Sequence, residues 1–411
     1  MIAAIAEGVS RITNYSTSAD CAATLSCLRE LGVRIDRSGG EIQINGAGKD
    51  GLRAPGKDLD CGNSGTTMRL LAGILAGQSF TSTLTGDESL RSRPMLRVVE
   101  PLGMMGAQVS SSDGRAPLTI HGRDSLKAID YELLIASAQV KSCILLAALN
   151  AKGKTTVTEN EVTRDHTERM LKSFGVPIET GSKGEHARFA AVTGPANLSA
   201  RDVSIPGDVS SAAYFIAAAV LLPESSLEIT NVGVNPTRIS FLSLLATLGF
   251  IEVTDASEVA NEPVGTITVR GVARENFLNE FESPLNIGRL EIPQLVDELP
   301  LLAVVGSQTR SGIEIRDAKE LRAKESDRIA TTVENLRAMG AEVEEFDDGL
   351  RVDGSTRLRG ARIDPRGDHR IAMAFSVAGL IAEGESEIGE AECVGVSFPE
   401  FFDLLESVIE R

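Results

Sequence analysis

Several cations of this sequence stand beside carboxylates or short polar residues. Arg93 lies in the segment RSRP, Lys324 and Arg328 lie in LRAKESDRI, and Arg370 lies in GDHR. A guanidinium group matches a carboxylate or a phosphate with two parallel hydrogen bonds, and an ammonium group binds them as a point charge. Because the chain carries a net charge of −17 at pH 7, these cations would create a local positive potential in a negative surround. The pattern predicts a cleft that binds one or two small polyanions.

Two carboxylates and one histidine near these cations could move protons. Asp297 precedes an apolar segment, Glu325 lies between Lys324 and Arg328, and His369 lies in GDHR. Carboxylate and imidazole groups held beside cations are suited to general acid–base work, so we expect Asp297, Glu325 and His369 to be catalytic. Lys324, Glu325 and Arg328 are also spaced like one exposed charged helix face, and RSRP could be a solvated turn. The sequence alone leaves these interpretations open.

Other classes of function are disfavoured by the sequence. The patterns HExxH, Ser-His-Asp and paired cysteines do not occur, so neither a metal site nor nucleophilic catalysis is supported. The five cysteines are scattered, which fits small buried residues in a reducing cytoplasm better than a disulfide framework. The negative charge and an aromatic content of 4% disfavour nucleic-acid binding. No apolar run reaches the roughly 18–20 residues that cross a membrane.

The segment from Cys61 to Gly86 shows how a chemically active group could be positioned. It begins with the short polar residues CGNSGTT, continues with the apolar run MRLLAGILAG and ends in the alternating segment SFTSTLT. Short polar side chains satisfy the free N–H groups of a first helical turn, and such a helix start favours an anion. The GxxxxGK[ST] spacing of a P-loop is absent. The segment therefore predicts a capped helix start, with Asn63, Thr66 and Arg69 as secondary site residues.

The same pattern recurs along the chain. An apolar residue followed by glycine marks each expected helix end, at Gly32, Gly103, Gly175, Gly249 and Gly340. The first four of these glycines are almost evenly spaced along the chain, and the interval before Gly340 is longer. Each pair is followed by two strand-like segments around a Gly or polar turn, and each interval contains a small-residue apolar helix followed by a strand. Fixed-period similarity indicates repeated supersecondary units around a shared core. We predict an α/β (α+β) fold of βαβαββ repeats whose Ala- and Gly-rich helices pack closely.

Six such units can be counted, which predicts two lobes of three repeats each. Pro206-Gly207, in VSIPGDVSS, is the candidate hinge, so we expect lobes at residues 1–206 and 207–411. The first repeat lacks its polar helix start and the strand before it, and the last repeat lacks its closing hairpin. From the repeat alone we expect a chain that is truncated at its N-terminus.

Seven segments that carry these polar residues resemble motifs of the enolpyruvyl transferases, and within them of the EPSP synthase family. They are GNSGTTMR (62–69), RSRPM (91–95), SAQVKS (137–142), TRDHT (163–167), IPQLVDELP (292–300), LRAKESDRI (321–329) and GDHRIAMAF (367–375). They occur in family order across essentially the whole chain. The resemblance implies a two-lobed fold with three βαβαββ repeats in each lobe, an inside-out α/β barrel.

The resemblance also implies a reaction. The enolpyruvyl group of phosphoenolpyruvate is transferred to the 5-hydroxyl of shikimate 3-phosphate with release of phosphate, a step of aromatic amino-acid biosynthesis that needs no metal or organic cofactor. Asp297 would be the base toward the 5-hydroxyl, and Glu325 and His369 would take part in proton transfer at C3. The residues that would hold phosphoenolpyruvate are Gly65, Arg93, Gln139, Arg328 and Arg370. Those that would hold shikimate 3-phosphate are Ser137, Gln139, Thr163, Asp297 and Lys324.

The sequence departs from the family at its N-terminus. The opening family motif, PG-x-K-S-x-S-x-R, supplies a lysine, a serine and an arginine, and this sequence begins just after its place. We therefore expect the chain as written to be inactive or nearly so.

Two other interpretations stay open. A UDP-N-acetylglucosamine enolpyruvyltransferase typically carries a cysteine in the loop that corresponds to residues 86–94, which here reads GDESLRSRP. A truncated, non-catalytic relic is the second. For the favoured interpretation we expect a cytoplasmic monomer that binds two small anionic substrates, with no nucleic-acid or membrane partner.

Overall fold

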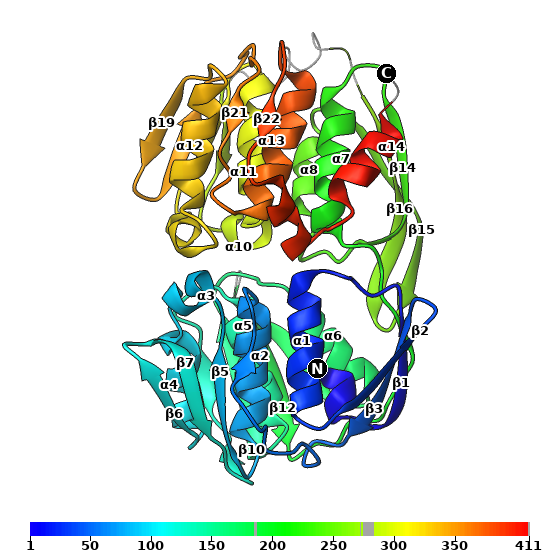
Figure 1. Ribbon diagram of the computed structural model, residues 1–411, viewed down its shortest axis with the longest axis vertical. Helices are drawn as coiled ribbons and strands as arrows, with labels where there is room; N and C mark the ends of the chain where they lie inside the picture. Colours follow the sequence, from blue (N-terminus) through cyan, green and yellow to red (C-terminus); the bar gives the residue numbers. More distant parts are fainter. Residues whose placement is uncertain (185–186, 272, 274–282, 410–411) are drawn as a thin grey trace. The chain divides into compact units, whose positions relative to one another are not determined.

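The computed structural model describes residues 1–184, 187–271, 273 and 283–409 (Figure 1). The chain divides into two compact units. The first consists of Met1–Ile205 and Val259–Glu262, and the second of Pro206–Glu258 and Pro263–Arg411. The short segment Val259–Glu262 belongs to the first unit although its neighbours in sequence belong to the second, an excursion that no sequence pattern indicated.

The first unit contains three successive sets of elements. The first set is η1 (Ile2–Ile5), β1 (Glu7–Thr13), α1 (Ala19–Glu30), β2 (Arg34–Ser38) and β3 (Glu41–Ala47). The second is β4 (Leu59–Asp60), α2 (Gly65–Ala76), β5 (Thr81–Thr85), α3 (Glu88–Ser92), α4 (Leu96–Met104), β6 (Gln108–Ser112) and β7 (Arg115–His121). The third is β8 (Leu126–Lys127), β9 (Asp130–Glu132), α5 (Ala138–Ala148), β10 (Ala151–Glu159), α6 (His166–Ser173), β11 (Ile178–Lys183) and β12 (Ala187–Gly194), and β13 (Val203–Ser204) follows.

The three sheets of this unit share one plan. Their strand orders are β13-β1-β3-β2, β4-β5-β7-β6 and β11-β12-β10-β8, with β9 also paired to β10. In each sheet a short strand runs parallel to the strand after the buried helix, and that strand pairs antiparallel with the closing hairpin. In the first sheet the short strand is β13, whose Val203 pairs with Ile12. A segment that follows the third set in sequence therefore completes the sheet of the first.

The second unit follows a similar plan, with shorter strands in its last two sets. Its first set is α7 (Val209–Leu221), β14 (Ser226–Gly233), α8 (Ser240–Leu245), β15 (Phe250–Val259) and β16 (Glu262–Arg270). Its second set is β17 (Leu285–Ile287), α10 (Ile292–Leu295), α11 (Leu299–Gln308), β18 (Ile313–Ile315), η2 (Lys319–Ala323), α12 (Arg328–Ala338), β19 (Val343–Phe346) and β20 (Gly349–Val352). The last set is β21 (Arg362–Ile363), α13 (His369–Ile381), β22 (Glu387–Ile388), η3 (Ala391–Val396) and α14 (Phe401–Val408). The strand orders are β14-β16-β15, β17-β18-β20-β19 and β21-β22.

Four of the buried helices begin where the sequence predicts polar helix starts. Ser64 caps α2 by accepting a hydrogen bond from the backbone N–H of Thr67. The same kind of contact, from an N–H two or three residues further on, is made by the side chains that cap α5, α7 and α13, namely Ser137, Asp208 and Asp368. These side chains satisfy N–H groups that a helix start leaves without a partner. The caps therefore fix the positions at which the buried helices emerge from the core.

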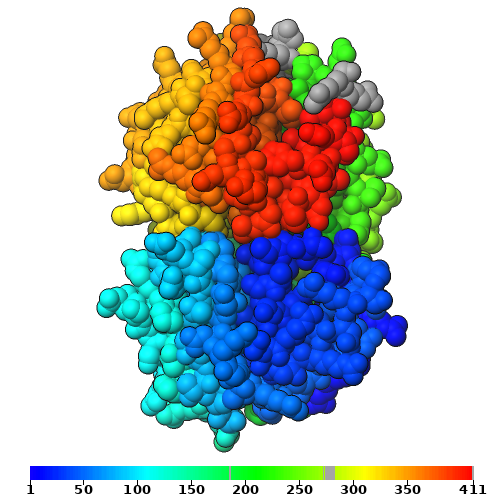
Figure 2. Space-filling view, viewed as in Figure 1, coloured from blue at the N-terminus to red at the C-terminus, as the bar shows by residue number. Residues whose placement is uncertain are grey.

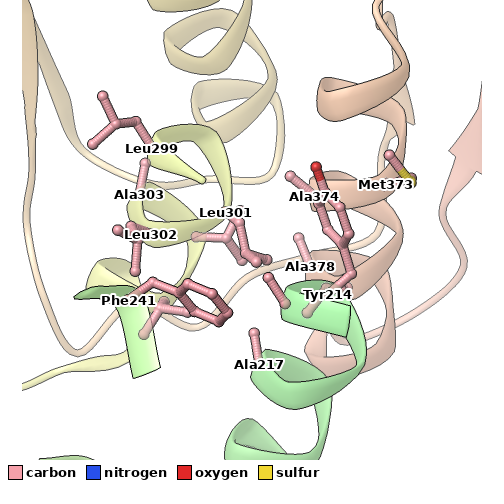
Figure 3. Packing of buried hydrophobic residues seen from close by; sticks show 14 of the residues in the cluster. Tyr214, Ala217, Phe241, Leu299, Leu301, Leu302, Ala303, Met373, Ala374 and Ala378 are labelled. Carbon is pink, nitrogen blue, oxygen red and sulfur yellow. The ribbon is translucent and has the colours of Figure 1, made fainter. Parts of the chain in front are cut away.

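Small side chains let the buried helices approach closely. A Cβ added at Gly73 of α2 would lie 2.2 Å from the carbonyl oxygen of Cys143 in α5, so only glycine permits this contact. In the second unit α7, α11 and α13 meet through residues such as Ala217, Leu301 and Ala378 (Figure 3). The predicted close packing of Ala- and Gly-rich helices is confirmed.

The C-terminal helix α14 covers part of the second unit. It lies at the surface in Figure 2, in red, with Leu404 43% exposed. Its Phe401 is buried and makes edge-on contacts with Tyr214 and Phe215 of α7, with ring centroids 5.9 and 5.7 Å apart. Edge-to-face aromatic pairs of this kind add to the free energy gained from burial alone.

A close contact between a glycine and a helix end occurs in five of the sets. A Cβ added at any of these glycines would lie 2.0–2.3 Å from a carbonyl oxygen at or next to the end of the buried helix of the same set. The pairs are Gly46 with Ala6, Gly122 with Gln78, Gly194 with Ala148, Gly271 with Leu222 and Gly354 with Thr309. Each glycine follows or ends the closing hairpin, so the hairpin is held directly against the helix end.

The structure corrects one predicted helix end. The hairpins predicted after Gly32, Gly103 and Gly340 are present as β2–β3, β6–β7 and β19–β20. Gly103, however, lies inside α4, and Gly106 takes the left-handed conformation with φ of 95°. Leu102 and Met105 are both fully buried, so the apolar face of the helix continues for one more turn before the chain reverses.

Two further observations concern the described part of the chain. No helix there combines the length and the apolar character needed to cross a membrane. All five cysteines are free thiols, with Cys27, Cys61 and Cys143 buried.

The glycine contact predicts a specific loss of stability. Gly122→Ala would place a methyl group 2.1 Å from the carbonyl oxygen of Gln78 and 2.5 Å from that of Leu75. Because backbone atoms cannot move aside cheaply, we expect the free energy of unfolding to fall by about 2–3 kcal/mol, measured by denaturant unfolding followed by circular dichroism.

Gly103→Ala is the matched control, since a Cβ there meets no atom within 4 Å and the residue is helical. Alanine is the better helix former, by up to about 1 kcal/mol, so this variant should be as stable as the parent or more so. Equal unfolding midpoints for the parent and Gly122→Ala would contradict the steric argument.

Candidate active site

Two guanidinium groups flank Gly65 at the start of α2. A Cβ added at Gly65 would lie 3.1 Å from Nη1 of Arg69 and 3.4 Å from Nη1 of Arg93. Both arginines are largely buried, with 8% and 7% of their surface exposed. The absence of a side chain at Gly65 thus leaves room for a small anion beside two cations and the first N–H groups of a helix.

Neutral polar side chains hold these arginines in place. Arg93 Nη2 donates to Oδ1 of Asn63 at 2.6 Å, and Asn63 Nδ2 donates to Asp87 at 2.7 Å. Arg69 Nη1 donates to Oε1 of Gln139 on α5. Gln139 donates in turn to the Thr66 hydroxyl at 2.8 Å. The structure therefore brings together Asn63, Gly65, Thr66, Arg69, Arg93 and Gln139.

Ser137 and Thr163 have other contacts. Ser137 caps α5 by accepting from the N–H of Val140 at 3.4 Å. Thr163 is 3% exposed, and both its N–H and its hydroxyl donate to Glu159, at 3.2 and 2.5 Å. A hydroxyl has one hydrogen to donate, so the direction of the Thr163 O–H bond is set by a carboxylate.

In the second unit Arg328 lies at the centre of a buried ion cluster. It is 1% exposed and donates through Nε to Asp368 at 2.8 Å and through Nη2 to Glu325 at 2.5 Å. Burial opposes both charges of the inner pair, but Asp368 raises the pKa of Arg328 above its usual range, and Arg328 lowers the pKa of Asp368. Both groups therefore stay ionised at neutral pH.

Asp297 links Arg328 to Arg370. Its Oδ1 lies 3.6 Å from Nη1 of Arg328, and its Oδ2 lies 3.4 Å from Nη2 of Arg370. Burial disfavours the charge of Arg370, yet Asp297 keeps the pKa of this guanidinium above its usual value. The cluster thus joins a candidate base to two cations that could bind anionic groups.

His369 follows Asp368 at the start of α13 and is 5% exposed. Burial, together with the neighbouring charge of Arg370, lowers its pKa to about 4. Its Nδ1 is buried and has no hydrogen-bond partner among the residues that the structure describes. The imidazole is therefore neutral at pH 7.

In the second unit Lys324 lies apart from the Arg328 cluster. Its Nζ is 3.7 Å from Oε1 of Glu320, one helical turn away. Glu325 and Arg328 belong to the buried cluster, so LRAKESDRI is more than the exposed charged face that its spacing also allowed.

The sequence matches the family model of EPSP synthase (3-phosphoshikimate 1-carboxyvinyltransferase) over residues 1–405. It is 50% identical over 421 residues to the 3-phosphoshikimate 1-carboxyvinyltransferase of Koribacter versatilis, covering 100% of this chain and 93% of that protein. The protein of the same name from Solibacter usitatus is 49% identical over 412 residues, with the same two coverages. The chain belongs to the EPSP synthase family.

Solved structures agree with this assignment. The EPSP synthase of Acinetobacter baumannii matches with a TM-score of 0.82 at 37% identity, over 99% of this chain and 92% of that one. The enolpyruvyl transferase NikO from Streptomyces tendae has a TM-score of 0.75 at 18% identity, over 99% and 90% of the two chains, which shows the fold alone. The predicted α/β fold and the resemblance to the EPSP synthase family are confirmed, and the chain is an enzyme of the carboxyvinyl-transferring class.

Some polar groups near the site residues of this EPSP synthase family member escaped sequence reasoning. Glu159 ends β10 in the unremarkable run TTVTE, and only its contacts with Thr163 reveal it. Arg238 donates to Ser210 and, at 3.1 Å, to Asp208 at the start of α7. A single charged residue at a strand end or in a loop carries no spacing signal, so neither residue could have been singled out before the fold was known.

The neutral state of His369 predicts how stability depends on pH. In the unfolded chain its pKa is about 6.5, and in the folded chain it is about 4, so the unfolded state binds a proton first. The contribution of His369 to the free energy of unfolding is therefore complete above pH 6.5. It is lost as the pH falls toward 4, which lowers the free energy of unfolding by up to about 3 kcal/mol. We expect the free energy of unfolding of His369→Asn to fall less steeply than that of the parent over this window.

His121→Asn is the control, because His121 is exposed and contacts only the Thr81 hydroxyl, at 2.9 Å, among the hydrogen bonds described. Its pH profile should run parallel to that of the parent. A parallel profile for His369→Asn as well would show that the imidazole does not titrate between these limits.

Proposed function

We propose that this chain transfers the enolpyruvyl group of phosphoenolpyruvate to the 5-hydroxyl of shikimate 3-phosphate, using the residues described above. The observation that carries the proposal is the convergence of Arg328 and Arg370 on Asp297. Two cations and one carboxylate are the groups needed to hold an anionic substrate and to remove a hydroxyl proton.

Phosphoenolpyruvate carries a carboxylate and a phosphate, each of which suits an arginine fork. In the first unit we assign its binding to Gly65, Arg93 and Gln139. Support comes from the space at Gly65 and from the contacts that hold Arg93 to Asn63 and Gln139 to Thr66. In the second unit we assign it to Arg328 and Arg370.

Shikimate 3-phosphate needs contacts for a phosphate group and for ring hydroxyls. We assign Ser137, Gln139 and Thr163 to this substrate in the first unit, and Asp297 and Lys324 in the second. Thr163 supports the assignment through an oriented hydroxyl, although its hydrogen is directed to Glu159. Lys324, paired with Glu320 at 3.7 Å and partly exposed, is able to turn toward an incoming phosphate.

The proton steps fall to the second unit. Asp297 takes the proton of the 5-hydroxyl while the oxygen of that hydroxyl bonds to C2 of phosphoenolpyruvate. C3 gains a proton, which gives a tetrahedral intermediate. Loss of phosphate from C2 and of one proton from C3 then restores the double bond. Because His369 is neutral at pH 7, we assign proton delivery at C3 to Glu325, with His369 as a neutral hydrogen-bonding group.

The assigned roles use no metal or organic cofactor. We further propose that the protein works as a monomer in the cytoplasm. The five free cysteines support a reducing compartment.

The choice of acceptor can be tested by measuring phosphate release. With phosphoenolpyruvate present, and contrary to the near-inactivity expected from the sequence alone, we expect phosphate to appear on addition of shikimate 3-phosphate and not on addition of UDP-N-acetylglucosamine. Mass spectrometry of the product should show the added enolpyruvyl group. Phosphate release with the nucleotide sugar in place of shikimate 3-phosphate would contradict the proposal.

The role of Arg93 can be separated from that of its neighbour Arg91. Arg93→Ala removes a buried guanidinium with charge-assisted hydrogen bonds, so we expect kcat/KM for phosphoenolpyruvate to fall about 10- to 100-fold. Arg91 lies on the short helix α3, which ends just before Arg93, and is exposed, so Arg91→Ala should change kcat/KM by less than about twofold. Equal kinetics for the two variants would remove Arg93 from the site.

A further inference from the structure

A buried ammonium group in the first unit has no place among the residues assigned so far. Lys141, on α5, is 1% exposed. Its Nζ lies 3.1 Å from Oε1 of Glu159 and 2.8 Å from Oε1 of Glu168. Desolvation of such a group costs as much free energy as the ion pairs return, so the cluster is weak evidence for stability. Its position relative to other groups is therefore the feature to explain.

Glu159 connects this ammonium group to a predicted substrate contact. One oxygen of Glu159 faces Lys141, and the other accepts from the N–H and the hydroxyl of Thr163. Glu159 is 5% exposed and Thr163 is 3% exposed. The path from Lys141 to the Thr163 hydroxyl thus runs through one carboxylate that water hardly reaches.

The same cluster fixes the start of α5. Lys141 lies four residues after Ser137 and two after Gln139 on this helix. Ser142, next to it, lies with its hydroxyl oxygen 2.7 Å from that of Thr167 on α6. Polar contacts therefore join α5, the end of β10 and the start of α6. Of the three residues assigned to this substrate in the first unit, Ser137 and Gln139 lie at the start of α5, and Thr163 lies in the loop between β10 and α6.

The charge of Lys141 matters to the Thr163 hydroxyl. Burial would lower the pKa of Lys141, but Glu168 and Glu159 raise it above its usual value, so the group stays charged. A phosphate offers only acceptors, so it competes with Glu159 for the single hydroxyl hydrogen of Thr163. When that hydrogen turns away, Glu159 keeps the Lys141 ammonium and the Thr163 N–H as partners.

We propose that Lys141 and Glu159 are positioning residues for the phosphate group of shikimate 3-phosphate. Glu159 holds the backbone and hydroxyl of Thr163 in place, and Lys141 balances the charge of Glu159 so that the hydroxyl can be given to the phosphate. Neither residue touches the substrate. This inference rests on the function proposed above, and it names the residues that position Thr163 for its proposed contact with the phosphate.

A double-mutant cycle between Glu159→Gln and Thr163→Val tests the inference. We expect each single substitution to raise the Kd for shikimate 3-phosphate, measured by titration calorimetry, and its KM by about tenfold. KM for phosphoenolpyruvate and kcat should change by less than about twofold. Because Glu159 acts through Thr163, the double variant should bind within about twofold of the weaker single variant.

Substitutions of Lys141 give a second measurement. Lys141→Met should raise the same Kd about tenfold, and Lys141→Arg, which keeps the charge, should bring it back to within about threefold of the parent. If Lys141→Met does not fold, the cycle between Glu159 and Thr163 decides alone. Glu179→Gln is the control, since it removes an exposed ion pair with Lys154 in the same unit, and it should leave the Kd unchanged.

Three results would overturn the inference: additive effects in the cycle, an equal loss of affinity for both substrates, or lower thermal stability with an unchanged Kd. Tighter binding of shikimate 3-phosphate by Glu159→Gln would overturn it as well. If the parent protein itself does not bind shikimate 3-phosphate, the proposed function fails instead, so the two failures are distinguishable.

Discussion

The contact between a glycine and the last carbonyl groups of a buried helix constrains the rest of each set of elements. At Gly122 the approach is so close that an added Cβ would lie 2.1 Å from a carbonyl oxygen, and four equivalent glycines behave alike. The contact fixes the hairpin to one end of the helix, and Gly73 fixes α2 against α5 along its length. Since a helix is stiff, its opposite end is fixed as well. Gly65 and Gln139 therefore owe their positions to glycines that lie far from them in sequence.

Charge balance is the second constraint on the site residues. Arg328 is almost fully buried and has Asp368, Glu325 and Asp297 around it, since an unpaired guanidinium in such a place would cost several kcal/mol. These carboxylates are thus needed for folding before any substrate binds. In the proposed function, a substrate anion would compete with the carboxylates that already pair with Arg328 and Arg370. Such competition would weaken the binding of anions that cannot use both arginines.

Local signals in the sequence were enough to predict many of the elements and the polar side chains at their starts. Caps such as Ser64 and Asp368 act within three residues, and hairpin turns act within four, so a single sequence reveals them. The predicted helix end at Gly103 was wrong because the pair Leu102-Gly103 has the pattern of a helix end, although the buried face of the helix extends to Met105. The pairing of β13 with β1 joins residues 191 positions apart. Glu159 contacts Lys141 across 18 positions, and Arg238 contacts Asp208 and Ser210 across 30 and 28. No local pattern encodes them.

The arginines assigned to the site in the two units have different kinds of partner, and the difference fits the assigned roles. In the first unit the arginines Arg69 and Arg93 bond to amide oxygens of Gln139 and Asn63, which cannot take up a proton at ordinary pH. In the second unit Arg328 and Arg370 bond to carboxylates, which can. Arg69 and Arg93 thus have neutral amide oxygens among their partners, while Arg328 and Arg370 have carboxylates among theirs, which are able to exchange protons. In the proposed function anion binding is assigned to both units, whereas every group assigned to proton transfer lies in the second.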